Sequence, residues 1–136
     1  MPTLNVDTDA SEMASICKFV EETSRNLGLD DRLARDLLLA VDEACINVVR
    51  HAYDGRGGDV EVTIELADDG VRAVIRDWGE AFDPLSVPEP DVSAPLHERT
   101  PGGLGLFLMR NVMDRVQFQF DGDKGNTLTM FRRLET

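Results

Sequence analysis

The segment Leu37–Tyr53 most constrains how this chain can fold, because it has the pattern of a helix that is apolar on two sides. When its residues are placed at about 100° per residue, most apolar side chains fall on one broad arc, and Leu39 and Ile46 form a second, smaller patch. A helix with this pattern is mostly buried. A narrow polar stripe separates the two apolar regions, and it consists of Asp36, Glu43, Asn47 and Arg50.

The polar stripe needs partners, because an unpaired polar group in a buried place costs several kcal/mol. Glu43 and Asn47 are four residues apart, so their side chains lie one turn apart on the same face. Two interpretations of this helix are open. The stripe is either a solvated edge on which Glu43 pairs with Arg50, or part of a functional site that contains a carboxylate and an amide.

Two later segments place glycines where the chain changes from one element to the next. The sequence DWGEAFD, from Asp77 to Asp83, follows a predicted strand, and GGLGL, from Gly102 to Leu106, opens a predicted helix. Glycines at a helix N-terminus let the backbone approach a phosphate closely, although this spacing is neither that of a Walker motif nor that of a Rossmann motif. The alternatives are an ordinary Asp-x-Gly turn in the first segment and a sharp loop without a ligand in the second.

The composition is that of one ordinary globular domain. The chain has 136 residues, of which 42% are hydrophobic and 29% charged, and this is enough for a single core. The net charge of −12 argues against a nucleic-acid surface, because such a surface clusters Lys and Arg. No apolar run reaches membrane length and no signal-peptide pattern is present, so we expect no membrane association. Cys17 and Cys45 lack metal-like spacing, which favours a reducing cytoplasm.

The order of the predicted elements indicates an α/β fold, in the form of an α+β two-layer sandwich that spans residues 1–136 as a single domain. Strands are expected at 3–7, 60–66, 71–76, 116–120 and 127–132, and helices at about 11–27, 31–53 and 104–113. Gly28 is the expected stop of the first helix, and Asp30 or Asp31 the cap of the second. Because the strands come mostly as hairpins, we predict a mixed, mostly antiparallel sheet with helices on one face.

The segment Asp83–Pro101 differs from the rest of the chain, since it holds five of the six prolines. A loop of this length inside a compact domain is usually functional or disordered. Its position between the two glycine segments makes it a candidate lid over a ligand. A tolerated insertion is the alternative.

Taken together, the motifs resemble those of a known superfamily. Glu43-x-x-x-Asn47, Asp77-x-Gly79 and Gly103-x-Gly105 follow the order of the motifs in the GHKL ATPases, which include gyrase, bacterial histidine kinases and anti-sigma-factor kinases. Within this superfamily the chain most resembles the small anti-sigma-factor serine kinases, over nearly its whole length from Leu4 to Leu134. The matching pieces are VDEACINVVRHAYDG, RDWGEAFDP, PGGLGLFLMRNVMDRV and GNTLTM. The resemblance implies the GHKL (Bergerat) ATP-binding fold.

The resemblance also implies a site for ATP or ADP. By analogy with the family, Asp77 accepts a hydrogen bond from the adenine amino group, Gly79 leaves room for the base, and Thr127 supports the adenine end. An ordinary strand residue is the alternative for Thr127. The same resemblance places further residues around the nucleotide, namely Phe82, Gly102, Gly103, Leu104, Gly105 and Leu106.

The polar stripe would supply the chemistry of this site. Asn47 offers a neutral oxygen suited to one position on a hydrated Mg²⁺, and Glu43, one turn away, can act as a general base. In the resembled kinases the equivalent glutamate activates a serine hydroxyl of a protein substrate. Arg50 is expected to contact phosphate or to hold Glu43. Arg99 is expected to reach the terminal phosphate, unless it is only a solvated loop charge.

Two functions of different classes follow from the resemblance. The first is an ATP- and Mg²⁺-dependent protein serine/threonine kinase that acts as an anti-sigma factor, phosphorylates a small anti-anti-sigma (STAS-type) protein and sequesters a sigma factor or another regulator. The second is a nucleotide-binding partner-switching module that sequesters its partner without kinase turnover. A plain ATP hydrolase or a detached histidine-kinase core is weakened, because neither His51 nor His97 lies on a predicted dimerisation helix. Homodimers are common in the resembled family, so a homodimer is possible for this chain as well.

Overall fold

A five-stranded antiparallel sheet forms one layer of the fold in the computed structural model, which describes residues 3–7, 13–48, 58–67, 69–79 and 103–134. The elements along the chain are β1 (Thr3–Asp7), α1 (Met13–Asn26), α2 (Asp31–Asn47), β2 (Asp59–Ala67), β3 (Gly70–Asp77), α3 (Gly103–Val112), β4 (Arg115–Phe120), the 3₁₀ turn η4 (Gly122–Lys124) and β5 (Asn126–Arg133). The strand order is β1-β2-β3-β5-β4. The predicted two-layer α/β fold is confirmed.

Every pairing between the described strands is antiparallel, whereas the sequence indicated a sheet that was mixed and only mostly antiparallel. The reason lies in the last part of the chain. After α3, β4 takes the outer edge, and a hairpin through η4 returns β5 to the free side of β3. This insertion of β5 keeps the strand directions alternating across the whole sheet.

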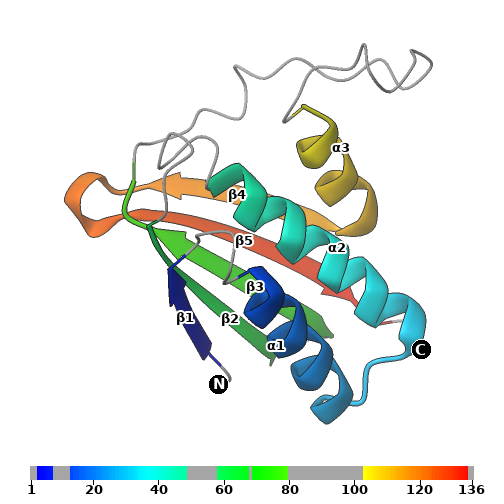
Figure 1. Ribbon diagram of the computed structural model, residues 1–136. Coiled ribbons are helices and arrows are strands. Elements are labelled where there is room, and N and C mark those ends of the chain that lie inside the picture. Colours follow the sequence, from blue (N-terminus) through cyan, green and yellow to red (C-terminus); the bar gives the residue numbers. More distant parts are fainter. Residues whose placement is uncertain (1–2, 8–12, 49–57, 68, 80–102, 135–136) are drawn as a thin grey trace.

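The three helices α1, α2 and α3 cover one face of the sheet, with α2 in the middle (Figure 1). The core fills the space between the two layers, and its largest fully buried members are Ile16, Val20, Leu37, Val41, Val60, Val62, Ile64, Val71, Ile75, Met109 and Met130. Cys45 is also fully buried, and burial raises the pKa of its thiol to about 12. No described helix is long and apolar enough to cross a membrane.

Strict alternation in the central strands decides which side chains face the helices. In β3 the inward positions are Val71, Ala73 and Ile75, and the last inward position is Asp77. On the other face of the sheet, Glu65 and Arg72 stand opposite each other and form an ion pair at 3.1 Å. Asp77 is therefore a charged residue at the end of an otherwise apolar inward row, and it marks the end of the sheet where a site can form.

Local signals in the sequence explain where the first two helices meet. α1 ends in a Schellman-type cap, in which Gly28 adopts a positive φ of 73° and Leu29 N–H donates to Ser24 O at 3.0 Å. Asp30 then caps α2 by accepting a hydrogen bond from Leu33 N–H at 2.7 Å. α2 ends at Asn47 with Val48 as its C-cap, and the rest of the predicted extension to Tyr53 lies outside the described residues.

Candidate functional site

The end of β3 and the start of β5 form a buried polar network. Asp77 and Asn126 are direct partners in the β3–β5 register and are 6% and 7% exposed. Asn126 Nδ2 donates to Asp77 Oδ1 at 2.8 Å and to Gly79 O at 3.1 Å, and Gly79 N–H donates to the same Oδ1 at 3.0 Å. Within the described part of the chain, both hydrogen bonds to the Asp77 side chain fall on Oδ1. The second carboxylate oxygen, Oδ2, is thus the one available to a ligand.

Burial sets the electrostatics of this carboxylate. Removal from water raises the pKa of Asp77 above its ordinary value, while the hydrogen bonds from Asn126 and Gly79 lower that pKa and offset part of the rise. The two donors hold the carboxylate in one orientation at the strand end. A held, partly desolvated carboxylate is a strong acceptor for a ligand N–H group, because a hydrogen bond to a charged group is worth more than a neutral one.

Gly125, the residue before β5, allows this close approach. Its φ of +95° lies in the region that favours glycine. A Cβ atom at Gly125 would lie 2.6 Å from Asp77 O and 3.0 Å from two ring atoms of Trp78. On the outer side, Arg76 packs over the Trp78 ring at 5.5 Å and donates to Lys124 O at 3.0 Å. The turn before β5 is therefore fixed against the end of β3.

Thr127, which the sequence placed at the adenine end, lies on the opposite face of the sheet from Asp77. The inward positions of β5 are Asn126, Leu128 and Met130, and Thr127 stands beside Arg76 on the outer face. The role of Thr127 at the adenine end therefore stays a prediction, whereas the residue of β5 that contacts the Asp77 side chain is Asn126. A signal for Asn126 was present in the sequence, because the apolar Leu128 and Met130 set the phase of inward positions.

The last turn of α2 brings the second polar group to the same end of the fold. Asn47 is 6% exposed, and neither Nδ2 nor Oδ1 of its side chain has a hydrogen-bond partner among the described residues. Glu43, one turn earlier, is half-buried. Figure 1 shows the end of α2 and the end of β3 on the same side of the sandwich, and α2 packs on β3. A buried amide with no partner is costly, and it indicates that a ligand belongs here.

The donor set fits a hydrated Mg²⁺ and not a metal held by protein alone. Asn47 offers a neutral oxygen, which is a suitable ligand for this hard cation. No group of three or more His, Cys, Asp or Glu side chains gathers into a metal cage within the described ranges. Mg²⁺ usually keeps several waters and is shared with substrate phosphates, so a single amide oxygen at this position is compatible with it.

The glycine segment forms the start of α3. The helix begins at Gly103, and Leu106 is buried in the core at 3% exposure, so Leu106 supports the helix from below. Gly105 lies in the first turn, and the side chain of Leu104 is not described. The other predicted site residues and the candidate lid lie outside the described residues, and these are Arg50, Phe82, Asp83–Pro101 (which contains Arg99) and Gly102.

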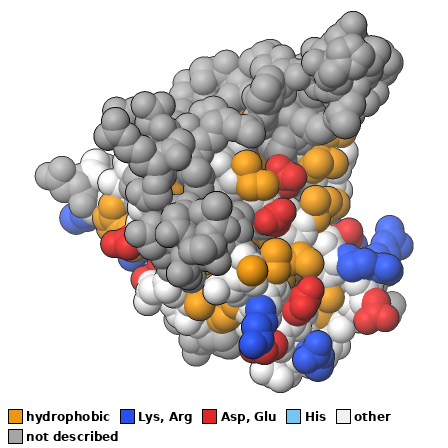
Figure 2. Space-filling model, in the orientation of Figure 1, with side chains coloured by type: hydrophobic (Ala, Val, Ile, Leu, Met, Phe, Trp, Pro, Cys, Tyr) orange, Lys and Arg blue, Asp and Glu red, His pale blue; other side chains and the backbone are white. Residues whose placement is uncertain are grey.

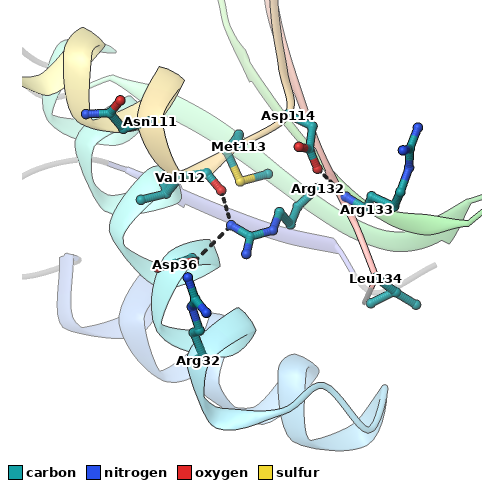
Figure 3. Close-up of a pocket in the computed structure, with 9 residues that line it drawn as sticks. All are labelled: Arg32, Asp36, Asn111, Val112, Met113, Asp114, Arg132, Arg133 and Leu134. Atoms are coloured by element: carbon teal, nitrogen blue, oxygen red, sulfur yellow. Dashed lines mark hydrogen bonds and ion pairs between the residues drawn. The ribbon is translucent and has the colours of Figure 1, made fainter. Parts of the chain in front are cut away.

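A hollow lies at the opposite end of the sheet, away from Asp77. Its volume is about 820 Å³, and its lining consists of Arg32, Asp36, Asn111, Val112, Met113, Asp114, Arg132, Arg133 and Leu134 (Figure 3). It contains none of the residues that the sequence predicted for the site. On the helical face, charged side chains of both signs lie among hydrophobic ones (Figure 2). The described part of this face has no continuous basic patch, in agreement with the net charge of −12.

Comparison with known sequences identifies one family profile and several similar relatives that share one description. The profile of the family described as histidine kinase-like ATPase domain matches residues 6–132. Serine-protein kinase RsbW of Halalkalibacterium halodurans is 35% identical over 130 residues, covering 92% of this chain and 78% of the relative. Serine-protein kinase RsbW of Bacillus licheniformis is 38% identical over 111 residues, covering 74% of this chain and 66% of the relative. The chain thus spans about two thirds to four fifths of these relatives.

Comparison with solved structures supports the same fold. The structure of the RsbU and RsbW domains of Rv1364c from Mycobacterium tuberculosis superposes with a TM-score of 0.67 and 23% identity, covering 98% of this chain and 33% of that one. The histidine kinase AdeS of Acinetobacter baumannii superposes with a TM-score of 0.54 and 12% identity, covering 100% of this chain and 69% of that one. At these identities the likeness concerns the fold alone.

Proposed function

The chain belongs to the histidine kinase-like ATPase family, in the branch of the serine-protein kinases called RsbW, and from this premise we propose that it is an ATP-dependent protein serine/threonine kinase with an anti-sigma role. Its substrate would be a small anti-anti-sigma protein of the STAS type, and its second partner a sigma factor or a similar regulator. The observation that carries the proposal is the buried, unpartnered amide of Asn47, one turn beyond Glu43 and at the same end of the fold as Asp77.

In this proposal the adenine base binds at the end of β3. The adenine amino group donates to Asp77 Oδ2, because Oδ1 already accepts from Asn126 and Gly79. The carboxylate is held in place before the base arrives, so little ordering is needed on binding. Gly79 adds no side chain next to the carboxylate, and this leaves space for a flat ring.

The phosphates would lie between the ends of α2 and α3. The N-terminus of α3 offers backbone N–H groups, and its first residues include Gly103 and Gly105. Asn47 would supply one ligand to Mg²⁺, which neutralises phosphate charge when bound. Glu43 would accept the proton of the substrate serine hydroxyl while the serine oxygen attacks the γ-phosphorus of ATP. The bond from the γ-phosphorus to the β,γ-bridging oxygen breaks, so that the products are phosphoserine and ADP.

The proposal includes a cytoplasmic location and homodimer formation, and no direct contact with nucleic acid or membrane. A cytoplasmic location agrees with the two cysteines, Cys17 and Cys45, which are both free thiols. The binding module without turnover is less well supported, because a pure binder has no need for a carboxylate one turn from the Mg²⁺ ligand. Glu43 is therefore the residue that separates the two functions.

Transfer of labelled phosphate from ATP to a STAS-type partner in the presence of Mg²⁺ tests this proposal. We expect Glu43→Gln to reduce the transfer rate by roughly 10²- to 10⁴-fold, the range for a general base, with little change in ATP affinity. Glu21→Gln, on the exposed surface of α1, is the control for loss of one carboxylate. A wild type that binds ATP and its partner but transfers no phosphate would favour the binding module.

A further inference from the structure

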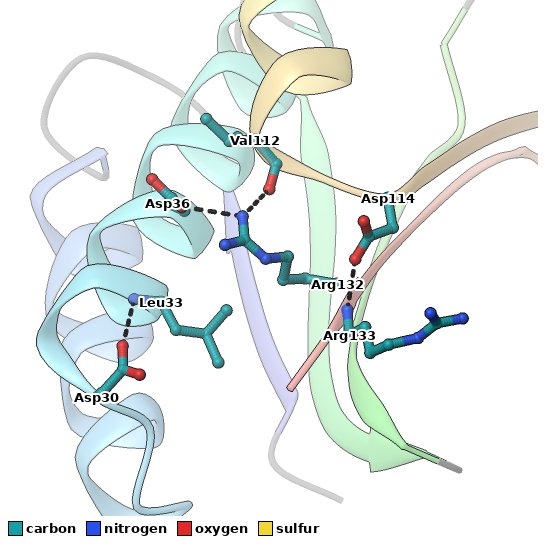
Figure 4. Close-up of polar contacts among 7 residues, drawn as sticks. All are labelled: Asp30, Leu33, Asp36, Val112, Asp114, Arg132 and Arg133. Carbon is teal, nitrogen blue, oxygen red and sulfur yellow. Dashed lines mark hydrogen bonds and ion pairs between the residues drawn. The ribbon is translucent and has the colours of Figure 1, made fainter. Parts of the chain in front are cut away.

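At the end of the fold opposite Asp77, the side chain of Arg132 joins three elements. Arg132 is the last inward residue of β5 and its side chain is 14% exposed. Its Nη1 donates to Asp36 Oδ2 on α2 at 2.9 Å and also to the carbonyl oxygen of Val112 on α3 (Figure 4). A single guanidinium nitrogen thus bridges one helix to another from the sheet.

Both acceptors of Arg132, the Asp36 carboxylate and the Val112 carbonyl oxygen, favour a nearby cation. Asp36 is the first member of the polar stripe on α2, and its side chain is 24% exposed in the ion pair with Arg132. Val112 is the last residue of α3, so its carbonyl has no partner within the helix. A cation at this position satisfies the carbonyl and complements the negative end of the helix dipole.

The same three elements carry the proposed nucleotide site at their other ends. β5 begins with Asn126, α2 ends with Asn47 and α3 begins with Gly103. From Asp36 to Asn47 the helix rises about 16.5 Å, and from Gly103 to Val112 α3 rises about 13.5 Å. The two helices pack together and run in opposite directions (Figure 1). Anchored at Arg132, the start of α3 therefore lies within about one helical turn of the level of Asn47.

Both packing and polar contacts hold this end of α3. The hollow of about 820 Å³ borders Val112 and Arg132 (Figure 3), so packed side chains do not enclose the junction on that side. Met113, the next residue, is buried at 5% exposure and keeps the helix attached to the core. Loss of the Arg132 contacts would thus let α3 tilt about its buried side without detaching.

We propose that Arg132 is a positioning residue for phosphoryl transfer, which sets the start of α3 relative to Asn47 and Glu43 through its contacts with Asp36 and Val112. This inference rests on the proposed function, because it assigns the phosphates to the gap between α2 and α3. The inference predicts that adenine binding and phosphate binding respond differently to a change at Arg132. The adenine contacts on β3 and the start of β5 do not depend on the tilt of α3, whereas the phosphate contacts do.

Calorimetric titration with adenosine and with Mg²⁺-ATP tests this separation. We expect Arg132→Met to leave the adenosine Kd unchanged and to weaken Mg²⁺-ATP binding by about 2- to 30-fold, the range for residues that couple distant sites. The turnover number for phosphoryl transfer should also fall. Arg132→Lys should restore part of both losses, since its ammonium keeps a cation near the two acceptors.

The neighbouring arginine provides a matched control. Arg133 faces the outer side, is 72% exposed and pairs with Asp69 at 3.1 Å, so Arg133→Met should change neither ligand affinity. Asp36→Asn, a milder change, should give the same pattern as Arg132→Met and carries the test if the latter fails to fold. Equal weakening of adenosine and ATP, or no change in either, would overturn the inference. A wild type that binds neither ligand would instead refute the proposed function itself.

Discussion

Asp77 divides its two carboxylate oxygens between the protein and the proposed ligand. Asp77→Asn would retain an oxygen for the donors Asn126 and Gly79, but it would place an N–H₂ group where Oδ2 now lies. The new side-chain N–H₂ group and the adenine amino group, which are both donors, would then face each other. We expect adenine nucleotide binding to weaken by about 1–3 kcal/mol, measurable by calorimetry. Unchanged affinity would remove Asp77 from the site.

The same substitution should have the opposite effect on stability. Burial raises the pKa of Asp77, so the folded protein binds this proton more tightly than the unfolded chain does. The stabilisation from that proton is complete below the unfolded pKa and is lost as pH rises through the folded pKa. At neutral pH the ligand-free Asp77→Asn protein should therefore melt at a higher temperature than wild type.

Thermal melts at neutral and acid pH would check this sign. The gain in melting temperature should shrink as pH falls through the raised pKa of Asp77, because the wild-type carboxyl is then protonated as well. Asp121→Asn, on an exposed turn, controls for the loss of one negative charge from a chain of net charge −12. If the gain in melting temperature were the same at acid pH, the ionised Asp77 carboxylate would not be the cause of the lower stability of the wild type.

Two glycines beside η4 offer a matched test of the approach between β5 and β3. Gly122 and Gly125 both have positive φ, at 61° and 95°, but a Cβ at Gly122 would meet nothing within 4 Å. Gly122→Ala should cost about 1–2 kcal/mol of folding stability from backbone strain alone. Gly125→Ala should cost more and also weaken nucleotide binding, because its Cβ would meet Asp77 O at 2.6 Å. If denaturant melts showed similar losses of stability in the two variants, and both kept the nucleotide affinity of the wild type, the close approach at Gly125 would not matter for the site.

At the scale of single elements, the sequence predicted most of the fold because its patterns are local. The alternation of β2 and β3 and the helical spacing of α2 both reflect burial on one side. Gly28 and Asp30 mark the junction between α1 and α2 through backbone conformation and capping. The strand directions were less well predicted, because the insertion of β5 between β3 and β4 depends on pairing between distant parts of the chain.

The register of β5 decides which of two neighbouring residues faces Asp77. In a strand, a shift of one residue moves a side chain to the other face, and this separates Asn126 from Thr127. We expect Asn126→Ala to weaken nucleotide binding by about 1–3 kcal/mol, since Asp77 loses a buried donor. Thr127→Val, its neighbour on the outer face, should leave binding unchanged. Calorimetry in which Thr127→Val is the damaging change would instead support the prediction that Thr127 contributes to the adenine end.

At the scale of the whole molecule, two polar clusters lie at opposite ends of the sandwich. One end holds the network of Asp77 and Asn126 and, on the same side, the buried amide of Asn47. The other end holds Arg132 and Asp36, which are separated by 96 positions in the sequence. No local pattern announces such a contact, because each residue alone is an ordinary charge on an amphipathic element. Sequence motifs identify the residues of the first cluster, whereas the contact between Arg132 and Asp36 is seen only in the folded structure.

In the proposed function Asn47, Glu43 and Asp77 form one nucleotide site, and titration with ATP in the presence and absence of Mg²⁺ tests this most directly. We predict that wild type binds ATP more tightly with Mg²⁺, that Asn47→Ala loses this Mg²⁺-dependent gain, and that Glu43→Gln retains it. The Asn47→Ala protein should still bind adenosine through Asp77. Absence of ATP binding by folded wild type, or the same Mg²⁺-dependent gain in Asn47→Ala as in wild type, would contradict the account.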